Sequence, residues 1–282
     1  MKRILVPVDF SIQSENALKT AAYYGRTFDY EIVAVHMLEL STAMMNNSNT
    51  TKETVLYLKL AENKFNEFLD KDYLKDVKVT PILKHYKVFT ELNTLYNEEK
   101  IDLVMMGSKG ATGFKEFLIG SNAQKVIRHS NVPVLVIKDE PLDHGFKKAI
   151  FACDFTDDSI GPYKRIKEFC DFIGLQTKMI YVNTPGKSFL SSAEMRNTVK
   201  NFFDKANNNS DHLEDVSYIS DYTIEAGITN YAKSYDADII IMTTHGRSSF
   251  SQIFDHSITE DVVNHVNIPV ISFKILPKSE RK

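Results

Sequence analysis

The chain has 282 residues, 43% of them hydrophobic, a formal net charge of −3 and a pI near 6.3. This balance offers no basic face of the kind that nucleic-acid binding requires, and no apolar run approaches the ~18 residues that cross a bilayer. The N-terminus enters a strand-like run without the long apolar stretch and cleavage site of a secretory signal, so we expect a cytoplasmic protein that binds neither nucleic acid nor membrane.

Short apolar runs alternate with helical segments through the first half of the chain. Strands are predicted at 3–9, 31–38, 77–84, 102–107 and 133–138, and helices at 14–27, 52–71, 89–99 and 121–130. Strands that are apolar on both faces and alternate with helices are typical of an α/β fold, in which helices cover both sides of a parallel sheet. The polar stretch 40–51 is predicted to be a loop; a role in covering a ligand and a plain surface role both stay open.

A glycine-rich stretch follows the fourth predicted strand. Gly107 and Gly110 are followed after nine residues by Gly120, Ser121 and Asn122, which open a predicted helix. Glycine lets the backbone approach a ligand closely, and a helix N-terminus offers unpaired N–H groups and a partial positive charge. Glycines also simply make tight turns, but the whole spacing at a strand-to-helix junction favours an anion site, for phosphate above all.

The second half of the chain repeats the first. Strands are predicted at 148–153, 177–182, 214–219, 238–243 and 269–274, and helices at 158–173, 189–208, 223–235 and 257–266. Asp102 and Asp238 are 136 residues apart, as are Pro133 and Pro269. A period of this length indicates two complete domains, predicted at 1–140 and 147–276, with a linker at 139–146 and a charged, disordered tail at 277–282.

The chain contains two cysteines, Cys153 in a predicted strand and Cys170 in a predicted helix. Their spacing is not that of metal ligands. Both are interpreted as small core residues in a reducing compartment.

The glycine spacing and its flanking strands resemble the universal stress protein family. The ATP-binding members of that family carry G-x2-G-x9-G-[ST], the pattern that runs here from Gly107 to Ser121. Residues 4–11 resemble the first strand of the family with its acidic end, and residues 131–136 resemble its last strand. Because the pattern occurs twice, the resemblance covers essentially the whole chain and implies two tandem, doubly wound domains, each with five parallel strands in the order 3-2-1-4-5.

The resemblance implies an adenine-nucleotide site, for ATP or another adenylate, in the first domain. In that order the sheet reverses between strands one and four, where open α/β sheets bind ligands at the carboxyl ends of their strands. Pro7 and Val8 would form a wall, the Met37 backbone would meet adenine, and Lys109 would add a cation. The predicted nucleotide-binding residues are Pro7, Val8, Asp9, Met37, Met106, Gly107, Lys109, Gly110, Gly120, Ser121 and Asn122.

Asp9 has two interpretations of equal weight. It could bind a ribose or a metal such as Mg²⁺ accompanying ATP, and it is the only candidate metal ligand in the sequence. It could equally be the N-cap or Asx-turn residue that precedes the first helix. The neighbouring strand residue His36 is interpreted as a packed histidine and not as a ligand.

The second domain departs from the glycine pattern. Thr243 stands at the position of Gly107 and His256 at that of Gly120, whereas Gly246 and Ser257 keep the residue types of Gly110 and Ser121. Side chains at these positions would occupy space that phosphates need. We therefore predict one nucleotide per chain and a blocked or empty second site.

No catalytic residue is assigned, because the sequence offers neither a Ser-His-Asp set nor paired carboxylates of defined geometry. The sequence favours an ATP-binding regulatory protein of the stress response with an unknown protein partner. A slow ATP hydrolase or phosphotransferase and a ligand-free interaction module stay open as alternatives.

The last strand of each domain is predicted to lie at a sheet edge. Residues 133–138 and 269–274 are apolar, and an open apolar edge invites pairing. The resemblance implies dimerisation through this strand, as in single-domain members of the family, so we predict that the two strands pair antiparallel within the chain as a pseudo-twofold internal dimer. Association of two chains as a homodimer stays open.

Overall fold

The computed structural model describes residues 2–38, 51–85, 92–108, 120–206, 214–245 and 256–276. The chain divides into two compact units, Met1–Glu116 with Ile137–His144 and Phe117–Val136 with Gly145–Lys282, called unit 1 and unit 2 below. The predicted domains, 1–140 and 147–276, follow the sequence repeat, and their boundaries stay predictions. The predicted loop before residue 51 and the predicted tail at 277–282 lie outside the described residues.

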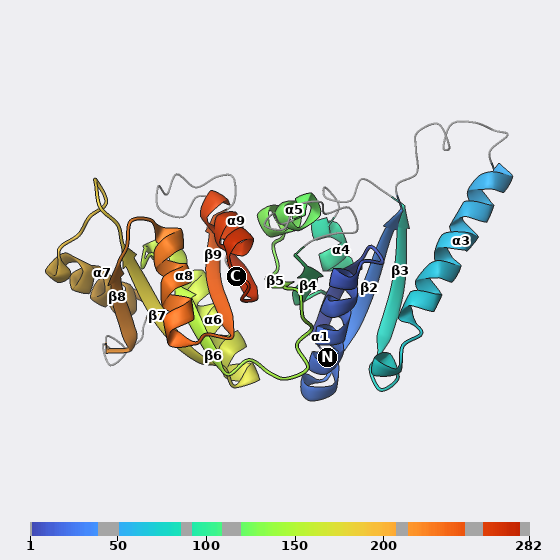
Figure 1. Ribbon diagram of the computed structural model, residues 1–282, viewed down its shortest axis with the longest axis horizontal. Helices are drawn as coiled ribbons and strands as arrows, with labels where there is room; N and C mark the ends of the chain where they lie inside the picture. Colours follow the sequence, from blue (N-terminus) through green and yellow to red (C-terminus); the bar gives the residue numbers. More distant parts are fainter. Residues whose placement is uncertain are drawn as a thin grey trace. The chain divides into compact units, whose positions relative to one another are not determined.

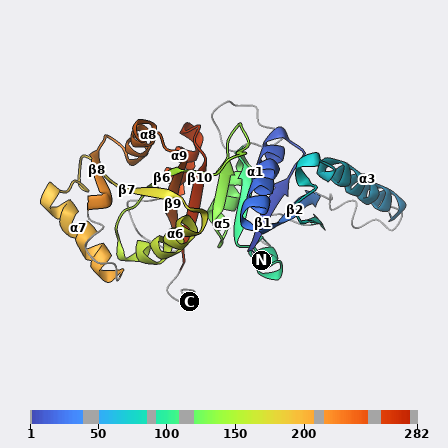
Figure 2. The ribbon, with the colours of Figure 1, turned by 90° about the horizontal axis from the view of Figure 1, so that it is seen from below.

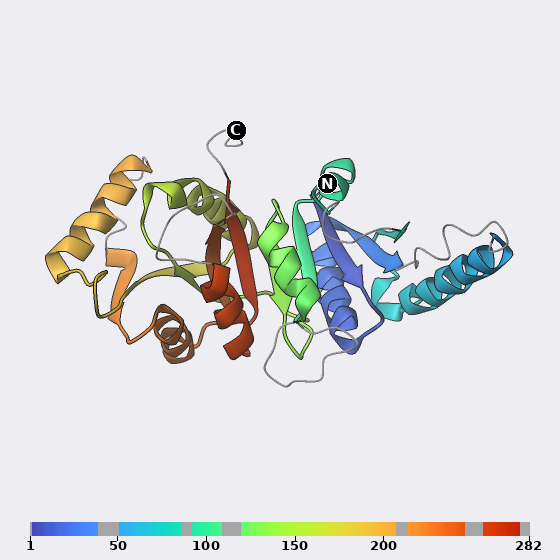
Figure 3. The same cartoon turned by 90° about the horizontal axis from the view of Figure 1, so that it is seen from above.

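Unit 1 contains a parallel sheet in the strand order β3-β2-β1-β4. Its strands are β1 (Lys2–Val8), β2 (Tyr30–Leu38), β3 (Val79–His85) and β4 (Leu103–Gly107). Its helices are α1 (Ile12–Phe28), α3 (Thr51–Leu69), α4 (Leu92–Glu98) and a short 3₁₀ helix (Asp72–Leu74). Helices α1 and α4 lie on opposite faces of this sheet (Figures 1–3).

Unit 2 contains the strand order β5-β10-β9-β6-β7-β8. Its strands are β5 (Val134–Ile137, the last residue of which belongs to unit 1), β6 (Lys148–Ala152), β7 (Gln176–Asn183), β8 (Val216–Ser220), β9 (Ile239–His245) and β10 (Val270–Ile275). Its helices are α5 (Ser121–His129), α6 (Ile160–Ile173), α7 (Ser192–Lys205), α8 (Ile224–Tyr235), α9 (His256–His265) and a 3₁₀ helix (Asp157–Ser159). Figures 2 and 3 show α6 and α7 on one face of this sheet and α8 and α9 on the other.

The predicted α/β fold and strand order are confirmed. Strands β8-β7-β6-β9-β10 follow the order 3-2-1-4-5 of the second repeat. In the first repeat the Ser108 N–H, just past β4, donates to the carbonyl of Ile137 at the end of β5. The predicted antiparallel pairing is also confirmed, because Val134, Leu135 and Val136 of β5 align with Ser272, Ile271 and Val270 of β10.

The core follows from strands that are buried on both faces. Ile4, Leu5 and Val6 of β1 are fully buried, as are Ile239, Ile240 and Ile241 of β9. A central parallel strand has helices above and below it, so consecutive side chains on both faces leave water. This continuous burial explains why the sequence shows apolar runs in place of alternation.

Glu31 of β2 is a charged residue within this core, only 2% exposed. Its Oε2 lies 3.1 Å from both Arg3 Nε and Lys78 Nζ, and its Oε1 accepts a hydrogen bond from Thr80 Oγ1 at 2.8 Å. Burial opposes ionisation, but the hydrogen bonds from Thr80 and Lys78 and the charges of Arg3 and Lys78 outweigh it, so the pKa of Glu31 lies below its ordinary value. Its ion pairs therefore stabilise unit 1 at neutral pH.

We expect Glu31→Gln to lower the free energy of unfolding by about 1–3 kcal/mol at pH 7, because it removes an ionised hydrogen-bond acceptor. A carboxyl group whose pKa is lower in the folded state than in the unfolded state stabilises the fold at pH values above its unfolded-state pKa. This stabilisation is lost as the pH falls through the folded-state pKa. The gap between wild type and variant should therefore narrow in acid. Urea unfolding followed by circular dichroism measures the free energy of unfolding at each pH, with the exposed Glu62→Gln as control. A difference between wild type and Glu31→Gln that stays constant down to the acid transition would contradict a lowered pKa for Glu31.

Candidate functional site

Six of the predicted site residues lie together at the carboxyl ends of three neighbouring strands in unit 1. Strand β1 aligns Val8 with His36 of β2 on one side and Leu5 with Val104 of β4 on the other. The six residues are Pro7 and Val8 in β1, Asp9 just after it, Met37 in β2, and Met106 and Gly107 in β4. Val8 and Met106 are buried, whereas Pro7, Asp9, Met37 and Gly107 are half-buried and line the more open part of this edge.

Asp9 organises the turn that connects β1 to α1. Its Oδ1 accepts hydrogen bonds from the Ser11 backbone N–H at 3.0 Å and from the Ser11 hydroxyl at 2.5 Å. Ser11 Oγ in turn accepts from the Ser14 N–H at 3.1 Å, which makes Ser11 the N-cap of α1. Asp9 is thus the Asx-turn residue and not the cap itself. The spacing Asp-x-Ser was the sequence signal for this arrangement.

Phe10, between these two residues, has a φ of 64°. This left-handed conformation is unfavourable for a bulky residue and needs support from its surroundings. The Phe10 ring lies 4.3 Å from the His36 ring and 5.5 Å from that of Phe68, measured between centroids, and Lys64 Nζ lies 4.3 Å from its centroid. Aromatic packing therefore fixes the turn at the end of β1.

His36 is held by a hydrogen bond and by ring packing. Its Nδ1 lies 2.7 Å from the Val8 carbonyl, which can only accept, so Nδ1 carries the hydrogen and donates. Its ring packs against Phe10. His36 is thus a packed strand histidine, as predicted, and it ties β2 to the backbone of a predicted site residue.

Gly107 at the end of β4 is in close contact with the first turn of α1. A Cβ at this position would lie 2.6 Å from Gln13 Cβ and 2.8 Å from the backbone carbonyl carbon and oxygen of Gln13. Backbone atoms cannot move aside as a flexible side chain can. Glycine is therefore required here by packing, whether or not a ligand is bound, and the sequence pattern alone did not reveal this second constraint.

We expect Gly107→Ala to destabilise the protein by about 1–3 kcal/mol through overpacking against the first turn of α1. Thermal unfolding compared with Gly161→Ala provides the test, because a Cβ at Gly161 would meet no atom within 4 Å. Equal melting temperatures for the two variants would contradict the packing role of Gly107.

The remaining described site residues open α5 in unit 2. Gly120 is the N-cap of α5, with a φ of −59° and a ψ of 143°, and makes no side-chain capping bond. Ser121 and Asn122 are exposed, and the first turn of α5 contains no acidic residue. A helix start without a capping side chain or a negative charge leaves its N–H groups available to an anion. Lys109 and Gly110 lie outside the described residues.

The second repeat builds the same turn with deeper burial. Asp154 is 5% exposed, and its Oδ1 accepts from the Thr156 N–H and hydroxyl and from Ser159 Oγ at 2.6 Å. Phe155 repeats the positive φ of Phe10, at 55°. Thr243 is fully buried where the first repeat has Gly107, and a 3₁₀ helix (Asp157–Ser159) precedes α6. Gly246 and the side chains of His256 and Ser257 lie outside the part of the chain that the structure describes.

Within the described ranges, no group of three or more His, Cys, Asp or Glu side chains is arranged to hold a metal ion. The same ranges contain no helix that is long and apolar enough to cross a membrane. Cys153 and Cys170 are both buried, as predicted, and burial raises the pKa of each thiol.

The sequence profile of the universal stress protein family matches residues 1–138 and 191–274. The chain belongs to this family. Two universal stress proteins of Methanocaldococcus jannaschii are similar to it. One is 34% identical over 153 residues, which cover 49% of this chain and 94% of that protein. The other is 30% identical over 146 residues, which cover 49% of this chain and 82% of that protein. Each relative thus has about the length of one repeat.

A solved universal stress protein from Archaeoglobus fulgidus matches the fold of the whole chain. It has a TM-score of 0.70 and 21% sequence identity and covers 99% of this chain and 97% of its own. The likeness extends over both repeats, so the predicted tandem universal stress protein architecture is confirmed.

Proposed function

We propose that this universal stress protein binds one adenine nucleotide, ATP or a related adenylate, with the site in its first repeat, and that it acts as a nucleotide-dependent regulatory protein of the stress response. The observation that carries the proposal is the complete glycine spacing from Gly107 to Ser121 between β4 and α5. Cytoplasmic localisation and an unknown protein partner are parts of the same proposal, whereas association of two chains stays open.

The N-terminus of α5 supports the phosphate part of the proposal. Gly120 lacks a side chain that would shield the first N–H groups, and Ser121 adds an exposed hydroxyl donor. Arg128 and His129 in the last turn complement the opposite end of the helix dipole. The first turn is thus suited to negative charge, and Lys109 and Gly110 would complete the phosphate contacts.

The carboxyl edge of unit 1 supports the nucleoside part. Asp9 lies at the end of β1 with its Oδ1 in the turn to α1, and a carboxylate there would accept a hydrogen bond from a ribose hydroxyl. Pro7 and the Met37 backbone would meet the base and sugar. Mg²⁺ would enter with ATP, on the phosphates and Asp9, and would neutralise part of the phosphate charge.

A regulatory role is favoured over an enzymatic one by the turn chemistry of Asp9. Its Oδ1 accepts two hydrogen bonds from Ser11, which caps α1, so Asp9 has a structural role in this turn. A general base needs to bind and release protons freely, which is at odds with a fixed role in the turn.

We expect Gly120→Val to abolish ATP binding with little loss of stability. The backbone angles of Gly120 are open to any residue, so the fold tolerates the substitution, whereas the added side chain occupies the space in front of the α5 N–H groups. Isothermal titration calorimetry should show at least a hundredfold weaker binding.

The matched control for this experiment is Gly161→Val in α6, where a Cβ would meet no atom within 4 Å. It should bind ATP as the wild type does. Unchanged ATP affinity in a folded Gly120→Val protein would refute the assignment of the phosphate site.

We expect ATP turnover well below roughly 1 per second, the low end of ordinary enzymes, because the sequence offers neither a Ser-His-Asp set nor paired carboxylates of defined geometry. Phosphate release from the purified chain with ATP and Mg²⁺ measures this rate. Turnover in the enzymatic range that disappears in Asp9→Asn would favour the hydrolase interpretation instead.

A further inference from the structure

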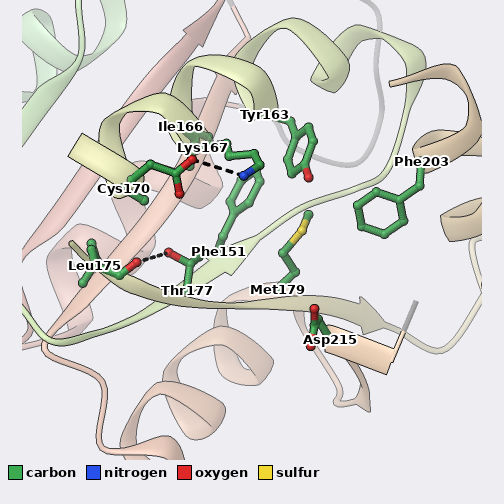
Figure 4. A pocket seen from close by; sticks show the side chains of 11 residues that line it. Phe151, Tyr163, Ile166, Lys167, Cys170, Leu175, Thr177, Met179, Phe203 and Asp215 are labelled. Atoms are coloured by element: carbon green, nitrogen blue, oxygen red, sulfur yellow. Dashed lines mark hydrogen bonds and ion pairs between the residues drawn. The ribbon is translucent and has the colours of Figure 1, made fainter. Parts of the chain in front are cut away.

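Unit 2 contains a cavity of about 220 Å³ beneath α6. Figure 4 shows side chains from α6 on one side and from β7 on the other facing this space, with Phe203 of α7 at one end and Leu175 at the other. None of its lining residues belongs to the predicted nucleotide site. It is thus a separate feature of the second repeat.

The interior of the cavity is apolar. Phe151, Ile166, Cys170, Met179 and Phe203 line it, and each is at most 8% exposed. Burial raises the pKa of the Cys170 thiol, which therefore stays neutral and contributes to the apolar wall. Contact between such a lining and an apolar molecule lowers the free energy, whereas contact with water does not.

The charged residues of the lining are Lys167, Asp171 and Asp215, which together carry a net negative charge. Lys167 Nζ pairs with Asp171 Oδ2 at 3.1 Å, and both side chains are half-exposed or more. Asp215 is a second carboxylate on the lining. Two negative charges and one positive charge repel an anion, so this site is unsuited to phosphates and carboxylates.

The aromatic wall of the cavity is fixed by edge-to-face contacts. The rings of Tyr163 and Phe203 meet at 5.9 Å and 76°, and those of Phe202 and Phe203 meet at 5.6 Å and 77°. Lys205, at the end of α7, pairs with Asp157 at 2.7 Å and attaches this helix to the start of the α6 segment. The cavity is therefore preformed, which reduces the entropic cost of binding.

The position that corresponds to Cys170 is filled in the first repeat. The left-handed C-cap residues Asp29 of α1 and Gly174 of α6 are 145 residues apart, which aligns Gly25 with Cys170. A Cβ at Gly25 would lie only 2.5 Å from Val77 Cγ1, because the chain of unit 1 packs directly against α1 there. The space beside Cys170 is thus closed at the equivalent position of the first repeat.

The volume limits the size of a ligand. An apolar cavity of about 150 Å³ is enough to hold benzene. The present cavity is larger and would accept one aromatic ring with a small substituent, or an aliphatic molecule of equal size. We propose that the cavity under α6 is a second binding site, selective for a small neutral apolar molecule of single-ring size.

The test uses toluene as probe and benzoate as its charged counterpart. Protein labelled with ¹³C at the methionine methyl groups reports the cavity through Met179, whose resonance is identified by its loss in Met179→Leu. Toluene should shift this resonance saturably, and benzoate should bind at least tenfold more weakly. Addition of ATP should not displace toluene.

Two substitutions at one position separate binding in the cavity from nonspecific partitioning. Cys170→Leu fills the cavity and should weaken toluene binding at least tenfold, whereas Cys170→Ala enlarges it and should retain binding. If Cys170→Leu does not fold, Ile166→Phe serves as the filling variant. The absence of a saturable shift up to the solubility of toluene, unchanged binding in a folded filled variant, or equal binding of benzoate would overturn the proposal.

Discussion

The close approach of α1 to the carboxyl ends of β1 and β4 is the constraint on which the arrangement of unit 1 depends. Gln13 occupies the space in which a side chain at position 107 would lie, and Ser11 begins the helix through a hydrogen bond to Ser14. Asp9 fixes the preceding turn, and the packed ring of Phe10 holds its unfavourable φ. The residues proposed to meet a nucleoside are therefore positioned by the same contacts that start the helix.

The second repeat keeps this turn but changes what surrounds it. Asp154 and Phe155 reproduce the Asx turn and the positive φ, which shows that both belong to the fold itself. Thr243 replaces the glycine, and α6 starts after an added 3₁₀ turn. Beneath the same helix, Cys170 borders an apolar cavity where Gly25 is packed against Val77. The two repeats thus differ in what each offers a ligand, although they share one strand order.

The alternation of strands and helices could be predicted from the continuous apolar runs and the repeat. The strand order was implied by the resemblance to the universal stress protein family, and the pairing of β5 with β10 by that order together with the apolar edge strands. The conformation of Phe10 could not be predicted, since nothing local favours a positive φ at an aromatic residue and ring contacts with His36 of β2 and Phe68 of α3 stabilise it. For Gly107 the sequence predicts a phosphate contact or a tight turn but not helix packing, because the contact with Gln13 depends on the exact approach of a helix. The cavity under α6 could not be predicted from the sequence either, because it arises where side chains fail to fill a space.

The central claim is that the two repeats are specialised and that only the first binds an adenine nucleotide. Native mass spectrometry of the intact chain at saturating ATP tests it most directly, because it counts bound nucleotides on each molecule. The account predicts a single added nucleotide that persists as the ATP concentration rises further. Two nucleotides of similar affinity, or none, would contradict it.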